Sequence, residues 1–420
     1  MIKSFGFPML LLLLCLGCQP SPPQPTDSFS NKAKATSLSY QERFDEIAEI
    51  VENHFFDSLK IVQEFPAIKQ RYESQVETIQ HQGQFSQLIG EMLTELKTSH
   101  TYYLCPSDVE YYWLGELFSR FVAPVQQVFN HQEVKYPSLG LLTQKLDQQT
   151  FVASVLPRSP ADSVGILAGD EILSINGGPY EPVDSLRAYI GQMVELAIRR
   201  KANGEVLYFN PSPQLLNPKD AFLTAQKNSA RLIESNGKQI AYIHIYSYAG
   251  EEYHDALISA IAYGSLKEAD ALIIDLRYGI GGADFSYLDI FNTQVPRSIS
   301  IDRRGEQYTY DTKWRKPAVY LTNGTTRSGK EVLAFGAKQF QLATVIGERT
   351  AGEVVAGQIH ALSNGDLLYL AVRDVQVEGV RLEGKGVAPD IEVPMDIRYT
   401  EGRDIQLESA VHFLVRQTKG

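Results

Sequence analysis

Cysteine and clustered positive charge are scarce in this sequence, and both absences limit what it encodes. Only three cysteines occur in 420 residues. Cys15 and Cys18 lie in the N-terminal apolar stretch, so Cys105 is alone in the remainder and cannot form an internal disulfide. The formal net charge is -11 and no Lys/Arg-rich block is present, which excludes nucleic acid as the main partner. No histidine, cysteine or carboxylate cluster has metal-ligand spacing, so we predict no metal and no cofactor.

Long hydrophobic runs are also missing, because the N-terminal "FPMLLLLLCL" is too short to span a bilayer. Lys3 precedes this run and Gly17 follows it, as in an export signal. Gly17 and Cys18 resemble a bacterial lipoprotein box, which implies acylation of Cys18. We therefore expect a signal peptide over 1–17, a flexible tether over 18–38, and a lipoprotein of the bacterial periplasm or cell envelope. An ordinary cleaved signal peptide is the alternative.

The remaining length exceeds what one hydrophobic core usually organises, so two or three domains are expected. Apolar residues recur at helical spacing in "FDEIAEIVENHF" and "FSQLIGEMLTEL", which predicts an N-terminal helical domain with a connecting segment over 39–135. Short strands and turns fill 136–215. From 216 to 420, β-rich runs alternate with helical periodicity, which indicates an α/β core. The predicted fold class is thus multi-domain α/β, α+β as a whole.

The segment "VLPRSPADSVGILAGDEILSING" resembles a PDZ domain, in which Ser-Pro-Ala opens a helix and Gly-Asp-Glu-Ile-Leu precedes an Ile-Asn-Gly turn. The resemblance places "SLGL" at the carboxylate-binding loop and implies that Ser138, Leu139, Gly140 and Leu141 bind substrate. Such a loop offers free N–H groups to a peptide C-terminus while the adjacent strand edge accepts the peptide. The alternative is a PDZ fold that serves only as a hinge or plug.

Ser328 lies in "YLTNGTTRSGKEVLA", between a buried strand pattern and a helix. A serine there is exposed next to the amides of a helix N-terminus, as a nucleophile would be. Serine is equally a common helix N-cap. The glycines of "DLRYGIGG" allow a close backbone approach and offer a second source of oxyanion donors. Local patterns alone leave the two interpretations of Ser328 open.

Four motifs in order, Asp275–Gly282, "NGTTRSGKEVLA", "ATVIGERTAGE" and "LEGKGVAPDIEVP", resemble the C-terminal processing and tricorn-type serine peptidases. The resemblance covers roughly 40–395 and implies a ClpP/crotonase-like core over 216–420. Glu353 stands where the Ser-Lys branch of this family has its lysine, so that dyad is excluded. We interpret Lys330, near Ser328, as a solvated charge.

The tricorn-like branch uses a serine, a histidine, a second serine beside it and a glutamate. The resemblance implies that Ser328 is the nucleophile and His100 the general base. Ser99 and Glu383 then orient the imidazole. The amides of Gly281 and Gly329 are assigned to the oxyanion.

Two positions depart from the family pattern. Gly279 replaces the usual asparagine, and the bulky Arg327 precedes the nucleophile.

The favoured function is an exported serine endopeptidase that captures a polypeptide end with its PDZ domain. One alternative is a catalytically weak or inactive PDZ peptide-binding protein, and another is an esterase with the same groups. The expected partner is a protein or peptide, and membrane contact is expected only through the lipid anchor. The sequence leaves the oligomeric state open.

Overall fold

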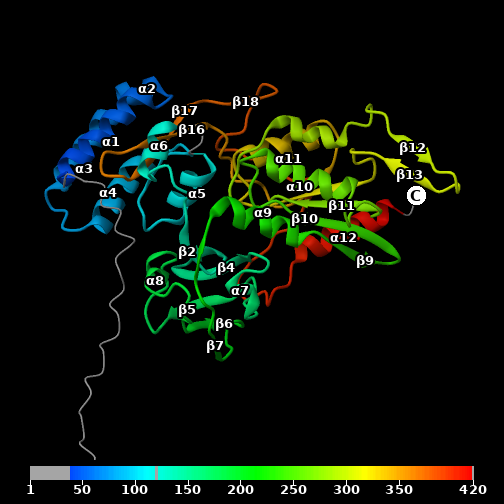
Figure 1. The fold of residues 1–420 in the computed structure, drawn as a ribbon. Helices are drawn as coiled ribbons and strands as arrows, with labels where there is room; N and C mark the ends of the chain where they lie inside the picture. The colour runs from blue at the N-terminus through cyan, green and yellow to red at the C-terminus, as the bar shows by residue number, and fades with distance from the viewer. Residues whose placement is uncertain (1–37, 119–121, 419–420) are drawn as a thin grey trace, which may run out of the picture. The chain divides into compact units, whose positions relative to one another are not determined.

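The computed structural model describes residues 38–118 and 122–418 of the chain (Figure 1). The predicted signal peptide, the lipidation site Cys18 and nearly all of the tether lie outside the described residues. Among the residues described, no helix combines the length and apolarity required to cross a bilayer.

Four helices open the described chain, and the first has a strong local start signal. Ser39 and Glu42 form a capping box, in which each side chain accepts the other's backbone N–H. The bounds are α1 (Tyr40–His54), α2 (Ser58–Gln63), α3 (Phe65–Val76) and α4 (Gln82–Thr94). Buried apolar residues of α1, α3 and α4 form a core with Leu368 and Leu370 of strand β17 (Leu367–Arg373). The N-terminal helices therefore pack on a strand from far along the chain.

A small antiparallel sheet joins the two distant parts of the sequence, in the order β1, β17, β16. Strand β1 (Tyr102–Leu104) pairs with β17 through Tyr102 and Tyr369, and β16 (Ala356–Ala361) lies on the other side of β17. Figure 1 shows the blue N-terminal helices beside the orange strands β16 and β17. This pairing fixes the position of the residues just before β1.

Two short helices, α5 (Val109–Leu117) and α6 (Ala123–Val128), precede a β-rich region. Its antiparallel five-stranded sheet has the order β3, β4, β5, β6, β7. The strands are β3 (Leu141–Leu146), β4 (Gln149–Val155), β5 (Glu171–Ile175), β6 (Leu196–Arg199) and β7 (Val206–Phe209). Helices α7 (Pro160–Ser163) and α8 (Asp184–Arg187) accompany this sheet, and β2 (Tyr136–Ser138) pairs with β8 (Gln214–Leu216).

The C-terminal part contains a six-stranded sheet in the order β20, β15, β14, β11, β10, β9. All neighbours pair in parallel except β9 with β10. The bounds are β9 (Arg231–Ser235), β10 (Lys238–His244), β11 (Ala271–Asp275), β14 (Ala318–Thr322), β15 (Thr344–Gly347) and β20 (Ile391–Glu392). The central strands are buried apolar runs, as expected for a sheet covered on both faces.

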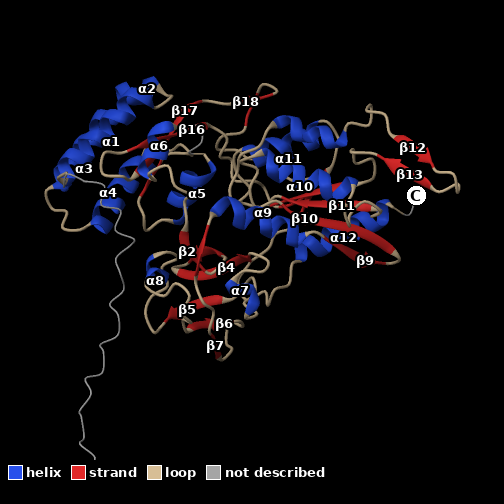
Figure 2. Ribbon diagram, viewed as in Figure 1, coloured by secondary structure: helices blue, strands red, loops and turns tan. Residues whose placement is uncertain are grey.

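Helices cover both faces of this sheet (Figure 2). Helices α9 (Pro218–Ser229), α10 (Glu251–Ala262) and α11 (Gly329–Gln339) contribute to the core on one face, and α12 (Ile405–Gln417) packs on the other. The remaining elements are η2 (Phe285–Phe291), β12 (Ser298–Ile301), β13 (Gln307–Tyr310), β18 (Gln376–Val377) and β19 (Val380–Arg381). The predicted α/β fold with N-terminal helices is confirmed. In such a sheet, ligands usually bind at the carboxyl ends of the parallel strands.

Candidate active site

Ser328 occupies the turn between β14 and α11, as the strand-turn-helix pattern predicted. Its φ of 59° and ψ of -133° lie outside the regions that a residue with a side chain ordinarily adopts. Its N–H donates to the carbonyl of Glu353, 2.9 Å away. Backbone strain of this kind, which costs about 1–3 kcal/mol, persists where the surroundings enforce it and is concentrated at functional sites.

His100 lies between α4 and β1, so the β1–β17 pairing carries it to the C-terminal part of the chain. It has a φ of 53° and only 5% of its surface is exposed. Its N–H donates to the hydroxyl of Tyr102 at 3.1 Å, and its Nδ1 lies 2.9 Å from Ser99 Oγ. His100 is therefore held at both its backbone and one ring nitrogen.

Glu383 completes this arrangement from the loop after β19. Its Oε1 accepts from Ser99 N–H at 2.9 Å, and its Oε2 accepts from Ser99 Oγ at 3.0 Å. The amides of Val354 and Val355 also donate to Oε2, at 2.8 and 3.2 Å. The buried carboxylate is thus an acceptor on all sides, as buried charged groups require.

These contacts determine which ring nitrogen of His100 carries the proton. A hydroxyl has one hydrogen, and Ser99 donates it to Glu383. Ser99 Oγ can then only accept from His100, so the imidazole carries its proton on Nδ1. The unprotonated Nε2 is left to accept a proton, as a general base requires.

Burial, and then the positive charge of Arg327, lower the pKa of His100 to about 4, although Glu383 acts in the opposite direction. Both effects disfavour the imidazolium. His100 is consequently neutral at neutral pH and competent to accept a proton.

His100 and Ser328 line one small cavity of about 40 Å³. No hydrogen bond joins Ser328 Oγ to His100 in this structure. The other residues that line the cavity are Tyr102, Glu110, Leu114, Phe118, Ile280, Gly281, Gly282, Arg327, Glu353 and Tyr369. Within the described part of the chain, no group of three or more histidine, cysteine or carboxylate side chains could hold a metal ion.

The loop of residues 278–282 lies directly against the start of α11. A Cβ added to Gly281 would lie 2.6 Å from Ser328 Cβ, and one added to Gly329 would lie 2.6 Å from the nitrogen of Ala283. Neither position can hold a side chain without a shift of the backbone. Among the described residues, no backbone carbonyl accepts from the amides of Gly281 or Gly329. Both donors are available beside Ser328.

Glu331 is a fully buried residue of this site that the sequence analysis missed. It accepts from the amides of Gly352 and Glu353, each at 2.7 Å, from the Thr350 hydroxyl, and from Ser328 N–H at 3.3 Å. Burial raises the pKa of its carboxyl, although the hydrogen bonds from these donors act to lower it. Glu331 therefore ties the nucleophile turn to 350–353. The Ser-x-x-Glu spacing from Ser328 was the available signal.

The interpretation of Lys330 as a solvated charge is wrong, because none of its surface is exposed. Its ammonium donates to the carbonyls of Tyr246 and Tyr278.

Glu353, at the position of the absent lysine, accepts from the Tyr102 hydroxyl at 3.3 Å and lies 3.9 Å from Arg327. It is an acceptor at the cavity wall and does not contact His100 through a hydrogen bond.

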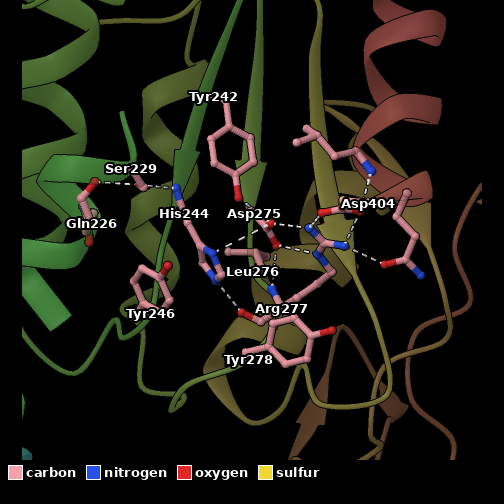
Figure 3. Close-up of polar contacts among 12 residues, drawn as sticks. Gln226, Ser229, Tyr242, His244, Tyr246, Asp275, Leu276, Arg277, Tyr278 and Asp404 are labelled. Carbon is pink, nitrogen blue, oxygen red and sulfur yellow. Dashed lines mark hydrogen bonds and ion pairs between the residues drawn. The ribbon is translucent and has the colours of Figure 1, made fainter. Parts of the chain in front are cut away.

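A buried ionic network anchors the start of the glycine loop. Figure 3 shows the guanidinium of Arg277 between the carboxylates of Asp275 and Asp404. Its Nη2 donates to one oxygen of each carboxylate at 2.6 Å. Burial opposes ionisation of Asp275, but Arg277 lowers the pKa of its carboxyl. His244 Nε2 lies 2.7 Å from the carbonyl oxygen of Arg277, and the imidazole ring of His244 stacks on the ring of Tyr246. Since a carbonyl only accepts, Nε2 is the protonated nitrogen of His244.

The predicted peptide-binding loop is enclosed in this structure. Ser138, Leu139 and Gly140 are buried, and Leu141 is partly exposed at the start of β3. Gly140 N–H donates to Ser138 Oγ at 3.0 Å, and the carbonyl of Leu139 accepts from Ala161 N–H at 3.0 Å. β3 is an edge strand of its five-stranded sheet. Peptide binding by these residues stays a prediction.

Three segments of the chain match known families. Residues 37–94 match the tricorn protease C1 domain, residues 151–200 match the PDZ domain, and residues 239–393 match peptidase family S41. The S41 match contains Ser328, Gly281, Gly329 and Glu383, whereas Ser99 and His100 lie between the first two matches.

Two curated relatives illustrate the range of these similarities. The chain is 27% identical over 325 residues to a carboxyl-terminal-processing protease of Synechocystis. The aligned region covers 72% of this chain and 74% of the relative. It is 25% identical to the putative tricorn protease homolog 2 of Streptomyces coelicolor, over 89% of this chain but 32% of the relative. The chain thus spans about a third of the second protein.

Two solved structures share the fold. The crystal structure of the tricorn protease matches with a TM-score of 0.53 and 19% identity, over 91% of this chain and 37% of that one. The structure of mature CPAF complexed with lactacystin matches with a TM-score of 0.52 and 13% identity, over 91% of this chain and 99% of that one.

Proposed function

Since this chain is a serine peptidase of the S41 type with a PDZ domain, we propose that it is an endopeptidase that acts through Ser328 and His100. The observation that carries this proposal is the chain of contacts from Glu383 through Ser99 to His100, which leaves Nε2 unprotonated on a residue that lines the same cavity as Ser328. Ester hydrolysis would use the same groups, and the PDZ domain favours a polypeptide.

In the proposed mechanism, Ser328 Oγ attacks the peptide carbonyl while its proton passes to His100 Nε2. The amides of Gly281 and Gly329 donate to the oxyanion that forms. His100 then gives the proton to the departing amine as the C–N bond breaks and an ester forms on Ser328. Water hydrolyses this ester, with His100 again as the base. His100 needs to turn or the cavity to tighten on substrate for the Ser328–His100 hydrogen bond to form.

The proposed substrate is a protein with an accessible C-terminal or unfolded end, captured by the PDZ domain. The support is the PDZ match and the edge strand β3, beside which a peptide could add as a further strand. The enclosed loop of Ser138, Leu139 and Gly140 would have to open for a terminal carboxylate to enter. Export, lipidation of Cys18 and a location in the bacterial cell envelope stay predictions from residues 1–18.

A fluorophosphonate probe tests the proposal, because it phosphonylates an activated serine, whose oxygen bonds to phosphorus as fluoride leaves. We expect the chain from Ser39 onward to cleave unfolded casein and to carry a single adduct on Ser328, with cleavage lost in proportion to labelling. Tandem mass spectrometry reads both the adduct and the fragment ends. Intact casein with no adduct, while a labelled peptide C-terminus still binds, would contradict catalysis and favour a peptide-binding protein.

The acid limb of kcat/KM should have its midpoint near pH 4, instead of the about 6.5 typical of histidine. His100 accepts a proton only when neutral, so activity is present above its pKa and is lost as pH falls through it. Arg327→Gln removes a positive charge that disfavours the imidazolium, so the limb should move to higher pH. Rates from pH 3 to 8 measure this shift, with the exposed Arg403→Gln as the control. An acid limb at the same pH in Arg327→Gln and the wild type would show that Arg327 does not lower the pKa of the general base.

A further inference from the structure

Lys330 is a fully buried cation that the proposed mechanism does not use. It is the second residue of α11, and its ammonium donates to the carbonyl of Tyr278 at 2.8 Å and to that of Tyr246 at 3.2 Å. No carboxylate in the described ranges lies within ion-pair distance of it. Burying an ammonium against carbonyls alone is unfavourable, so a cation retained here indicates a role other than stability.

Both carbonyls belong to the support of the glycine loop. Tyr278 opens that loop with a φ of 56°, and its N–H donates to Thr325 Oγ1 at 3.0 Å. The carbonyl of Tyr246 also accepts from Ile280 N–H at 2.9 Å. A Cβ on Gly279 would lie 2.1 Å from the same oxygen, so the loop rests directly on it. The ammonium therefore connects the helix that follows Ser328 to the loop that presents Gly281.

We infer that Lys330 is a positioning residue, which holds the glycine loop so that the amide of Gly281 faces the oxyanion formed at Ser328. The inference rests on the proposed function. Lys330 does not contact the reacting atoms and is not a base. Its ammonium supplies hydrogen bonds that an apolar side chain of the same length cannot. The neutral amine supplies fewer donors and no charge, so the loop is held less firmly when Lys330 loses its proton.

The charged and titratable groups around Lys330 lie on β10 and β11, in the loops that follow these strands, and in the turn before α11. Burial lowers the pKa of Lys330 to about 7, Asp275 of β11 opposes this, and Arg327 before α11 adds to it. His244 of β10 is neutral near pH 7, since burial lowers its pKa to about 4. Burial also raises the phenol pKa values of Tyr246 and Tyr278, so both stay uncharged. The network of Arg277 with Asp275 keeps its charge over this range. Lys330 is thus the group here that titrates near neutral pH.

The test is Lys330→Met, assayed by kcat and KM on a peptide substrate from pH 5 to 9. We expect kcat at pH 6 to fall about 10- to 100-fold with KM within about twofold, less than the loss of a whole oxyanion donor. The wild type should lose kcat as pH rises through about 7, and this alkaline limb should be absent from the variant. Lys338→Met on the same helix is the matched control, because Lys338 also donates to a carbonyl, that of Ala388. It should keep both kcat and the limb.

A stability measurement separates positioning from folding. The pKa of Lys330 is lower in the folded protein than the about 10.4 of an unfolded chain, so the unfolded state binds the proton more tightly between these values. The buried charge therefore destabilises the fold below pH 7. Lys330→Met should melt no earlier than the wild type at pH 6 even though its kcat is lower.

A Lys330→Met variant whose kcat equals that of the wild type and still falls as pH rises through about 7 would overturn the inference. If the variant does not fold, the wild-type profile still decides, since a flat profile between pH 6 and 9 contradicts a role for the ammonium. Failure of the proposed function is distinguishable, because the wild type itself would then neither cleave casein nor label at Ser328.

Discussion

Ser328→Ala should lower kcat/KM on a peptide by about 10⁵-fold or more, and His100→Ala should lower it by a similar factor. The serine supplies the electron pair that forms the acyl-enzyme, and the histidine supplies the base that makes its hydroxyl nucleophilic. Each is of no use without the other. The double variant should therefore be no slower than either single variant, which is the signature of two residues that act as one unit.

Initial rates over a wide range of enzyme concentration measure these losses, because residual activity from a contaminating peptidase sets the floor. Ser300→Ala on β12 and His412→Ala on α12 are matched controls, since both side chains are exposed and neither lines the cavity of Ser328 and His100. They should keep wild-type rates. A Ser328→Ala variant that keeps more than about 1% of activity would show that another residue is the nucleophile. Additive losses in the double variant would show that His100 acts on a different step.

The sequence predicts some parts of this site better than others, according to how local their causes are. The place of Ser328 follows from a buried strand, a turn and a helix that are contiguous in the chain. His100 has no such local signal, because its position depends on β1 pairing with β17. Only the resemblance to a family connected it with Ser328. Long-range strand pairing is what periodicity in a single sequence does not reveal.

The error at Lys330 has a physical reason. A lysine on the first turn of a helix is almost always solvated, and the sequence does not show that two separate loops each turn a carbonyl toward this one. The partners are Tyr246 and Tyr278, which lie in the loops that follow β10 and β11. Glu331, one position later, could have been predicted from its capping-box spacing to Ser328. The backbone amides at 350–353 that donate to it could not have been predicted from the sequence. Buried polar residues are the hardest to place, because their partners are tertiary.

Glu383→Gln should lower kcat/KM by about 10³-fold while the fold is retained, although the change removes no atom that contacts substrate. The carboxylate accepts the only hydrogen of the Ser99 hydroxyl and the amides of Val354 and Val355. The NH₂ of glutamine cannot accept, so in the Oε1 place it faces the Ser99 N–H, and in the Oε2 place it faces the Ser99 hydroxyl and both valine amides. In the second orientation the Ser99 hydroxyl turns its hydrogen to His100 Nδ1, which moves the imidazole proton to Nε2. The base then presents a proton to Ser328 where it should accept one, as in an Asp-to-Asn change of a serine-protease triad.

Three measurements distinguish this tautomer effect from a general loss of packing. Ser99→Ala removes the hydroxyl that would donate wrongly, so adding it to Glu383→Gln should recover part of the lost rate instead of lowering it further. The acid limb of Glu383→Gln should lie at lower pH than that of the wild type, because the negative charge that raises the pKa of His100 is gone. The exposed Glu392→Gln should change neither. A Glu383→Gln variant with wild-type kcat/KM would show that the contact between Ser99 and Glu383 does not set the protonation of His100.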